Sequence, residues 1–375
     1  MKKLLNYNVK WICASFKRKS ILLLSSMKKI VFGILMLCII SSCNERKKSF
    51  ILNFPLKLEL KNAVCLVDSC IAPTNIVLMD DILVYKEKGQ NVLMRYFDIN
   101  TGIVRKFLPR GNGPGEVNNV IRLTVSDSIL QIFTDPEKIL LYHYKDFFSK
   151  DNIFPRKELS LLSGQSAFAS AFQLYSNQIF YSGKSSETDT CRYCVYNIEQ
   201  NSIYSFAGFP KYDSNIQSFP TFDMSKQLAY QGDFVFSPTK DKIFFFFFYA
   251  LGFDIVDTEK WEVVCQQIYQ YPDVKLNHIS ELNINKVSRN PESLCGFIDA
   301  CATNEYIYVL YTGKHFNEDY SSGKHVLQYD WEGEPQKYYV LDVEINSIAV
   351  DEKNKLLYAT TNEENARIVK YRIGI

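Results

Sequence analysis

The stretch Lys242-Ile-Phe-Phe-Phe-Phe-Phe-Tyr249 decides the fold. Aromatic and β-branched residues favour strands over helices, so this run predicts a β-strand. Its apolar residues do not alternate with polar ones, which indicates that both faces of the strand are covered. Such a strand is typical of a propeller blade, because each blade packs between two neighbours. We therefore expect an inner strand of a blade here.

The same pattern, a turn residue followed by a short apolar run, recurs five more times along the chain. Six units between Ile76 and Ile375 average about 50 residues, a size typical of blades with several strands. The sequence thus predicts an all-β fold, a six-bladed β-propeller of four-stranded antiparallel blades over residues 61–375. A generic array of β-sandwiches and a pair of unrelated β domains are the alternatives. The other five copies lie at residues 81–85, 128–133, 178–181, 306–311 and 355–358.

A second motif follows most copies and consists of an aromatic residue, then Asp or Asn, then an apolar residue. Its acidic members are Asp98, Asp254 and Asp330. A carboxylate cluster is one interpretation of these residues. Their equivalent places beside turns favour the other interpretation, in which each Asp caps local backbone groups.

Closure of the ring needs a strand from the start of the folded region. The final blade is expected within residues 345–375, and the apolar segments at residues 52–60 and 63–67 are both available to extend it. We predict that one of the two does so, because closure removes an exposed sheet edge.

The charge is unevenly distributed. Residues 1–43 hold eight basic residues and no acidic one, so all 41 acidic residues and 35 of the 43 basic ones follow Cys43. The body of the protein is therefore mildly acidic, which makes it a poor partner for nucleic acid.

The N-terminal segment is typical of a secretory signal. Lys28 and Lys29 precede an apolar run over residues 30–40, and small residues lead to Cys43. Eleven apolar residues are too few to span a membrane as a helix. We expect an upstream extension over residues 1–26, a lipoprotein signal peptide over residues 27–42 and a lipidated tether over residues 43–60.

Two short motifs resemble those of known families. Ile40-Ser-Ser-Cys43 resembles the lipobox of bacterial lipoproteins, which implies cleavage before Cys43 and a membrane anchor through a lipid on its thiol. Arg110-Gly-Asn-Gly-Pro-Gly-Glu116 resembles the signature of TolB-like six-bladed β-propeller envelope lipoproteins. The resemblance implies a propeller fold and a place in the bacterial cell envelope, but no reaction.

The glycine-rich loop at residues 110–116 has two interpretations. Its N–H groups could cradle an anion, but a phosphate-binding loop would carry Lys followed by Ser or Thr. A tight connection between blades, with Glu116 capping backbone N–H groups, fits the sequence better.

The binding surface is predicted on one face of the propeller. Residues 110–116, 205–231 and 271–297 are expected to be return connections between blades, and the last two are unusually long. We expect them to meet over one mouth of the central channel, while the opposite face carries no long loops. The candidate binding residues are Arg110, Gly111, Asn112, Gly113, Gly115, Glu116, Phe206, Phe209, Tyr212, Phe219 and Phe222.

No catalytic constellation stands out. The four histidines are scattered, and no Gly-x-Ser-x-Gly motif occurs. Cys191 and Cys194 have metal-like spacing without a second pair, and buried thiols are expected for the seven cysteines after Cys43. The sequence leaves open whether disulfides form between Cys65 and Cys70 or between Cys295 and Cys301.

The sequence therefore predicts a monomeric, lipid-anchored binding or scaffold module for a protein or glycan partner. We expect neither a metal nor a cofactor. The alternative is a propeller hydrolase or lyase that acts on glycans or peptides with acids at the mouth of the channel.

Overall fold

A computed structural model describes residues 53–88, 91–113, 115–135, 138–148, 153–160, 171–175, 177–183, 190–210, 229–279, 284–363 and 365–374. The segments predicted as extension, signal peptide and lipidation site lie outside these residues. The chain divides into two units, residues 1–54 and 55–375, and the second unit carries the strands. Among the described residues, no helix has the length and apolar character needed to cross a membrane.

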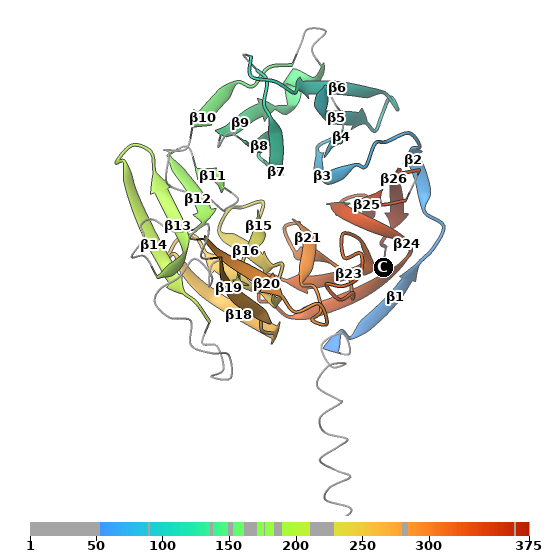
Figure 1. Ribbon diagram of the computed structural model, residues 1–375. Coiled ribbons are helices and arrows are strands. Elements are labelled where there is room, and N and C mark those ends of the chain that lie inside the picture. The colour runs from blue at the N-terminus through green and yellow to red at the C-terminus, as the bar shows by residue number, and fades with distance from the viewer. Residues whose placement is uncertain are drawn as a thin grey trace, which may run out of the picture. The chain divides into compact units, whose positions relative to one another are not determined.

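Four sheets of the second unit are antiparallel, have four strands each and follow one another in chain order. Figure 1 shows them around a ring, with the first strand of each sheet innermost. Their strands are β3 (Thr74–Met79), β4 (Ile82–Lys86), β5 (Val92–Asp98) and β6 (Val104–Pro109); β7 (Asn119–Ser126), β8 (Ile129–Asp135), β9 (Lys138–His143) and β10 (Lys157–Ser160); β11 (Ala171–Tyr175), β12 (Gln178–Ser182), β13 (Cys191–Asn197) and β14 (Ser202–Gly208); and β15 (Gly232–Phe236), β16 (Lys242–Phe247), β17 (Leu251–Asp257) and β18 (Glu262–Gln270).

A fifth sheet has eight strands and occupies the next part of the ring. Its central strand, β24 (Pro335–Asp351), is 17 residues long and changes partners along its length. The first part of β24 pairs with β23, and the part from Ile345 onward pairs with β25. The other strands on this path are β21 (Phe297–Ala302), β22 (Tyr306–Tyr311), β23 (Gly323–Asp330), β25 (Leu356–Thr361), β26 (Ile368–Arg372) and β2 (Val64–Val67).

The ring is closed by a strand from the start of the folded unit. β2 pairs antiparallel with β26, which confirms the prediction for the segment at residues 63–67. The other segment forms β1 (Leu56–Leu60), which pairs in parallel with β24 through Leu58 and Tyr339 instead of joining β26. Since β1 is part of a sheet, the folded unit starts at Pro55 and not at residue 61.

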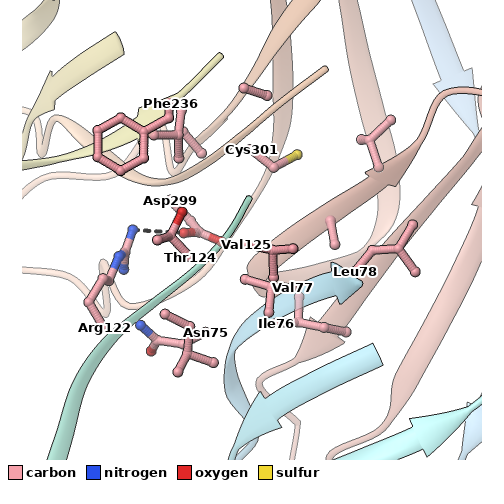
Figure 2. A pocket seen from close by; sticks show the side chains of 16 residues that line it. Asn75, Ile76, Val77, Leu78, Arg122, Thr124, Val125, Phe236, Asp299 and Cys301 are labelled. Carbon is pink, nitrogen blue, oxygen red and sulfur yellow. Dashed lines mark hydrogen bonds and ion pairs between the residues drawn. The ribbon is translucent and has the colours of Figure 1, made fainter. Parts of the chain in front are cut away.

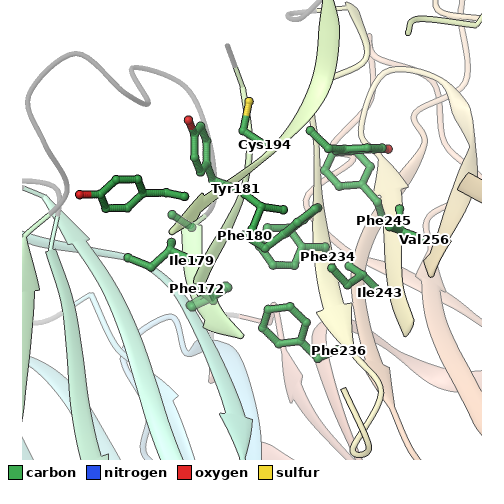
Figure 3. Close-up of a cluster of buried hydrophobic side chains, with 14 of the residues drawn as sticks. Phe172, Ile179, Phe180, Tyr181, Cys194, Phe234, Phe236, Ile243, Phe245 and Val256 are labelled. Carbon is green, nitrogen blue, oxygen red and sulfur yellow. The ribbon is translucent and has the colours of Figure 1, made fainter. Parts of the chain in front are cut away.

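The phenylalanine run lies in β16, the second strand of its sheet, and its residues 244–247 are buried. The strand is covered on both faces, as predicted. On one side the third and fourth sheets share an aromatic core, in which the rings of Phe180 and Phe234 meet edge to face with centroids 4.7 Å apart (Figure 3). Such pairs add about 0.5–1.5 kcal/mol each beyond their buried area. Packing between sheets therefore stabilises the ring.

The repeated acidic motif is confirmed in two places and wrong in one. The carboxylates of Asp98 and Asp330 accept hydrogen bonds from backbone N–H groups of the turns that follow them. Asp254 is instead buried inside its sheet and pairs with Arg192. Asp257, at the end of β17, caps the turn there. The motif in this sheet was thus placed three residues too early.

One return connection contains regular structure. β19 (Val274–Ile279) and β20 (Ile284–Arg289) form a hairpin within residues 271–297 and pair with no other described strand.

Candidate functional site

Polar side chains are directed into the centre of the ring by a local irregularity that three inner strand segments share. The strand register shifts just before Arg122 in β7, Asp299 in β21 and Ser347 in β24. A β-bulge of this kind turns the following side chain to a new direction. Each bulge is thus followed by a polar residue where the flanking positions are mostly apolar.

Arg122 joins two carboxylates that lie far from it in the sequence. Its Nη2 donates to Asp299 Oδ1 at 2.9 Å (Figure 2), and its Nε pairs with Asp233 Oδ2. Both carboxylates are buried. The three residues come from β7, β15 and β21, so one guanidinium connects the inner strands of three sheets.

The hydrogen bonds continue around the ring from Asp299. Its Oδ2 accepts from Ser347 Oγ at 2.6 Å and from the N–H of Ile348 at 2.8 Å. The N–H of Ile76 in β3 donates to Ser347 Oγ at 2.8 Å. We call Arg122, Asp233, Asp299 and Ser347 the channel network, which reaches the first, second, fourth and fifth sheets.

The channel acids are poorly placed for proton transfer. Burial raises the pKa of Asp299, against the opposing effect of Arg122 and the hydrogen bonds from Ser347 and Ile348. A catalytic acid or base must reach the proton that it moves. Both oxygens of Asp299 are already engaged by groups of the protein, so the network is suited to holding strands together.

The cavity beside the network is small. It holds about 100 Å³ and is lined by the inner strand segments β3, β7, β15, β21 and β24 (Figure 2). Sites for drug-sized ligands measure roughly 300–1,000 Å³. The cavity therefore accommodates water and small ions, not a sugar chain or a peptide.

A larger groove lies on the face opposite to the return connections. It measures about 510 Å³ and is lined by the β15–β16, β21–β22 and β23–β24 turns, including Lys242, Tyr306, Trp331 and Glu332. Two of its charges are already paired, since Lys242 Nζ lies 3.0 Å from Glu332 Oε1. Short turns from two neighbouring sheets thus leave a polar hollow between them.

The glycine-rich loop is filled by its own carboxylate. Glu116 Oε2 accepts a hydrogen bond from the N–H of Gly113 at 2.9 Å, which confirms the capping role. A Cβ at Gly111 would lie 2.0 Å from this oxygen, and Gly115 has φ +74° with the Phe154 ring against it. Because Glu116 occupies the loop, the anion-cradle interpretation was wrong. The side chains of Arg110 and Asn112 are exposed beside it.

The predicted aromatic residues separate into three groups. Phe206 lies on β14, where it is buried against Tyr193 and Trp261, so it belongs to the core and not to a loop surface. Phe209 is half-buried and lies 6.0 Å from the ring of Tyr230. Tyr212, Phe219 and Phe222 lie outside the described residues.

The cysteines considered for disulfides are free thiols. This holds for Cys65, Cys70, Cys295 and Cys301, so neither disulfide forms. Burial raises the pKa of Cys295 to about 12 and that of Cys70 to about 11, which keeps both protonated. In the part of the chain that the structure describes, no three His, Cys, Asp or Glu residues are arranged to hold a metal ion.

The fold and the channel define an all-β propeller with four-stranded antiparallel blades. The chain belongs to the TolB-like 6-blade propeller-like family, whose model matches residues 57–353. Sequence reasoning identified this family but missed Arg122, Asp233 and Asp299. No curated protein matches the chain.

Solved propellers resemble the chain at low identity. A protein from Bacteroides fragilis described as exported is 14% identical, with a TM-score of 0.49, over 84% of this chain and 98% of that one. The propeller domain of Cps50 (Swd1) from Myceliophteria thermophila is 13% identical, with a TM-score of 0.45, over 84% and 99%. Both TM-scores lie below 0.5.

Proposed function

We propose that this chain is a lipid-anchored, six-bladed propeller of the bacterial cell envelope that binds a protein or glycan partner without transforming it. The two halves of the eight-stranded sheet would be the fifth and sixth blades, since β24 changes partners midway. The observation that carries the proposal is the pairing of both channel acids with Arg122.

The enzymatic alternative needs acids that are free to act. Glycoside hydrolases place two carboxyl groups roughly 5–9.5 Å apart on either side of the bond that breaks. Asp233 and Asp299 instead share one guanidinium beside a cavity of about 100 Å³. This arrangement favours a structural role for the acids and supports a binding surface outside the channel.

The face of the return connections is the better candidate for binding. The N–H of Arg110 donates to the carbonyl of Asn91 in the β4–β5 turn, and the N–H of Phe248 in the β16–β17 turn donates to the carbonyl of Gln231. Both turns join the second and third strands of a blade. The described ends of the connections at residues 110–116 and 205–231 therefore lie beside these turns, which supports the proposed binding face. Exposed Arg110 and Asn112 and half-buried Phe209 are the described candidates for contact with a partner.

Capture of a partner tests the proposed function. Full-length protein with a C-terminal affinity tag would be retrieved from detergent-solubilised envelope, with a heat-denatured bait as the control. We expect a partner that is recovered intact. Recovery of shortened fragments, whose formation stops in Asp233→Asn, would instead support the hydrolase or lyase.

The lipid anchor has its own test, which rests on the motif that ends at Cys43. Cells that express the wild type or Cys43→Ser would be labelled with a fatty acid. We expect label on the wild type and an unlabelled, unprocessed Cys43→Ser protein. Equal labelling of both would exclude lipidation at Cys43.

A further inference from the structure

Three aromatic rings surround the guanidinium of Arg289, the last residue of β20. Its central carbon lies 4.1 Å from the ring centroid of Tyr249, 5.4 Å from that of Phe316 and 5.9 Å from that of Tyr320. Tyr249 belongs to the β16–β17 turn, and the other two belong to the β22–β23 connection. We call these three rings the aromatic box; it lies between the fourth and the fifth sheet.

The box holds its cation without a carboxylate. Arg289 Nη1 donates to Tyr320 Oη at 2.7 Å and Nη2 donates to Tyr249 Oη at 2.5 Å. Among the described residues, its guanidinium contacts these hydroxyl groups and rings, and no carboxylate pairs with it. Ring faces attract cations through their quadrupoles, and aromatic boxes of this kind bind cationic ligands in many proteins. The box is thus neutral, and a guanidinium from another molecule would find the same contacts there.

The segment that carries Arg289 is joined weakly to the rest of the ring. Among the described strands, β19 and β20 pair only with each other, and an isolated two-stranded hairpin is marginally stable. At its base, Asp273 Oδ2 accepts from Asn290 Nδ2 at 2.6 Å and from Ser293 Oγ at 3.1 Å. These bonds lie outside the hairpin, so Arg289 can leave the box while the base stays closed.

We propose that the aromatic box is a binding site for an arginine side chain of a protein partner, and that Arg289 is its built-in occupant. The proposal rests on the binding function proposed above and assigns it a site and a partner chemistry. A partner would displace Arg289 by offering the same group in the same contacts, and the hairpin would undock from the box.

Arginine fits the box better than lysine does. The guanidinium is planar and presents several N–H donors in a fixed fork, and it stacks on aromatic faces. In the box, one face lies over Tyr249 while two separate nitrogens donate to two tyrosine hydroxyls. An ammonium group has no plane to stack and cannot place its donors in this way.

The test uses methylguanidinium as the probe and N-methylurea as its neutral control, titrated into full-length protein and followed by NMR. Arg289→Ala empties the box, and Arg289→Ala/Tyr249→Ala removes its main ring. We expect Arg289→Ala to bind methylguanidinium at least about tenfold more tightly than the wild type does, and more tightly than it binds N-methylurea. The double variant should lose this gain.

Several results would overturn the proposal. Arg289→Ala that binds methylguanidinium no better than the wild type would reduce Arg289 to a structural anchor, provided that its spectrum shows a folded protein. Equal affinity for methylammonium would exclude the preference for arginine. These outcomes concern the box alone, whereas failure to capture any envelope partner would count against the binding function as a whole.

Discussion

Arg122 and Arg289 both bring together segments that lie far apart in the sequence, but their surroundings differ. Arg122 is buried between inner strands and is neutralised by two carboxylates. Arg289 lies in a half-buried box of aromatic rings, where no carboxylate of the described residues pairs with it, on a hairpin that pairs with no other described strand. Removal of Arg122 would leave two buried carboxylates without a counter-charge. Removal of Arg289 would leave only neutral aromatic side chains without their cation. The comparison separates a residue that holds the ring together from one that occupies a binding site.

Deletion of residues 50–68 should have the largest effect, because it removes β1 and β2. Without β2 the ring has no closing strand on β26, and the sheet that contributes Asp299 and Ser347 to the channel network loses its edge. We expect loss of cooperative thermal unfolding, measured by circular dichroism. An unchanged melting curve would show that the ring closes in another way.

Arg122→Met should destabilise the protein strongly, since it leaves Asp233 and Asp299 buried without a counter-charge. Removal of one partner of a buried ion pair costs about 3–5 kcal/mol. The free energy of unfolding from urea titration measures this effect. Arg289→Met is the matched control, and equal losses in the two variants would contradict the distinction between the two arginines.

The pH dependence of stability should reveal the burial of Asp299. Because its folded pKa is raised, the folded state keeps a proton that the unfolded state has lost, and stability falls as pH rises from about 3.8 through the folded pKa. The unfolding free energy of wild type minus that of Asp299→Asn should therefore decrease in this window.

Asp319 provides a control, because its pKa is shifted in the opposite direction to that of Asp299. Hydrogen bonds from Ser321 lower its pKa. Its contribution to stability is lost only as pH falls below about 3.8 through the folded pKa. The difference between wild type and Asp319→Asn should stay flat above that pH, and a flat profile for Asp299→Asn as well would show that Asp299 has no raised pKa.

Arg289→Met should have the smallest effect on global stability, about 1 kcal/mol or less, because the hairpin can undock without opening the ring. Hydrogen exchange would show the local effect. We expect faster exchange of backbone amides in β19 and β20 and unchanged exchange in β16 and β22. Faster exchange throughout would mean that Arg289 also supports the blades.

Much of the fold could be predicted from the sequence, because blades repeat and their apolar runs are local signals. The phenylalanine run in β16 and the closing strand at residues 64–67 are examples. The motif at Asp254 was placed wrongly, because an aromatic-Asp-apolar triplet occurs inside a strand as well as at its end. Asp257 at the end of β17 caps the turn instead.

The site was harder to predict, because its residues are brought together by ring closure. Arg122 and Asp299 are 177 residues apart, and neither belongs to a motif by spacing. One local signal was present, a polar residue that interrupts the apolar start of an inner strand. Phe206 shows the converse limit, since nothing in its sequence context distinguishes a buried strand position from a loop surface.

Partner recovery from detergent-solubilised envelope, compared among three forms of the protein, tests the central claim most directly. The forms are wild type, Arg289→Ala and Arg289→Ala/Tyr249→Ala, each confirmed as folded by its urea titration. The claim that the aromatic box binds a partner's arginine predicts more partner with Arg289→Ala than with wild type, because the built-in occupant no longer competes, and little with the double variant. Equal recovery by all three forms would contradict it.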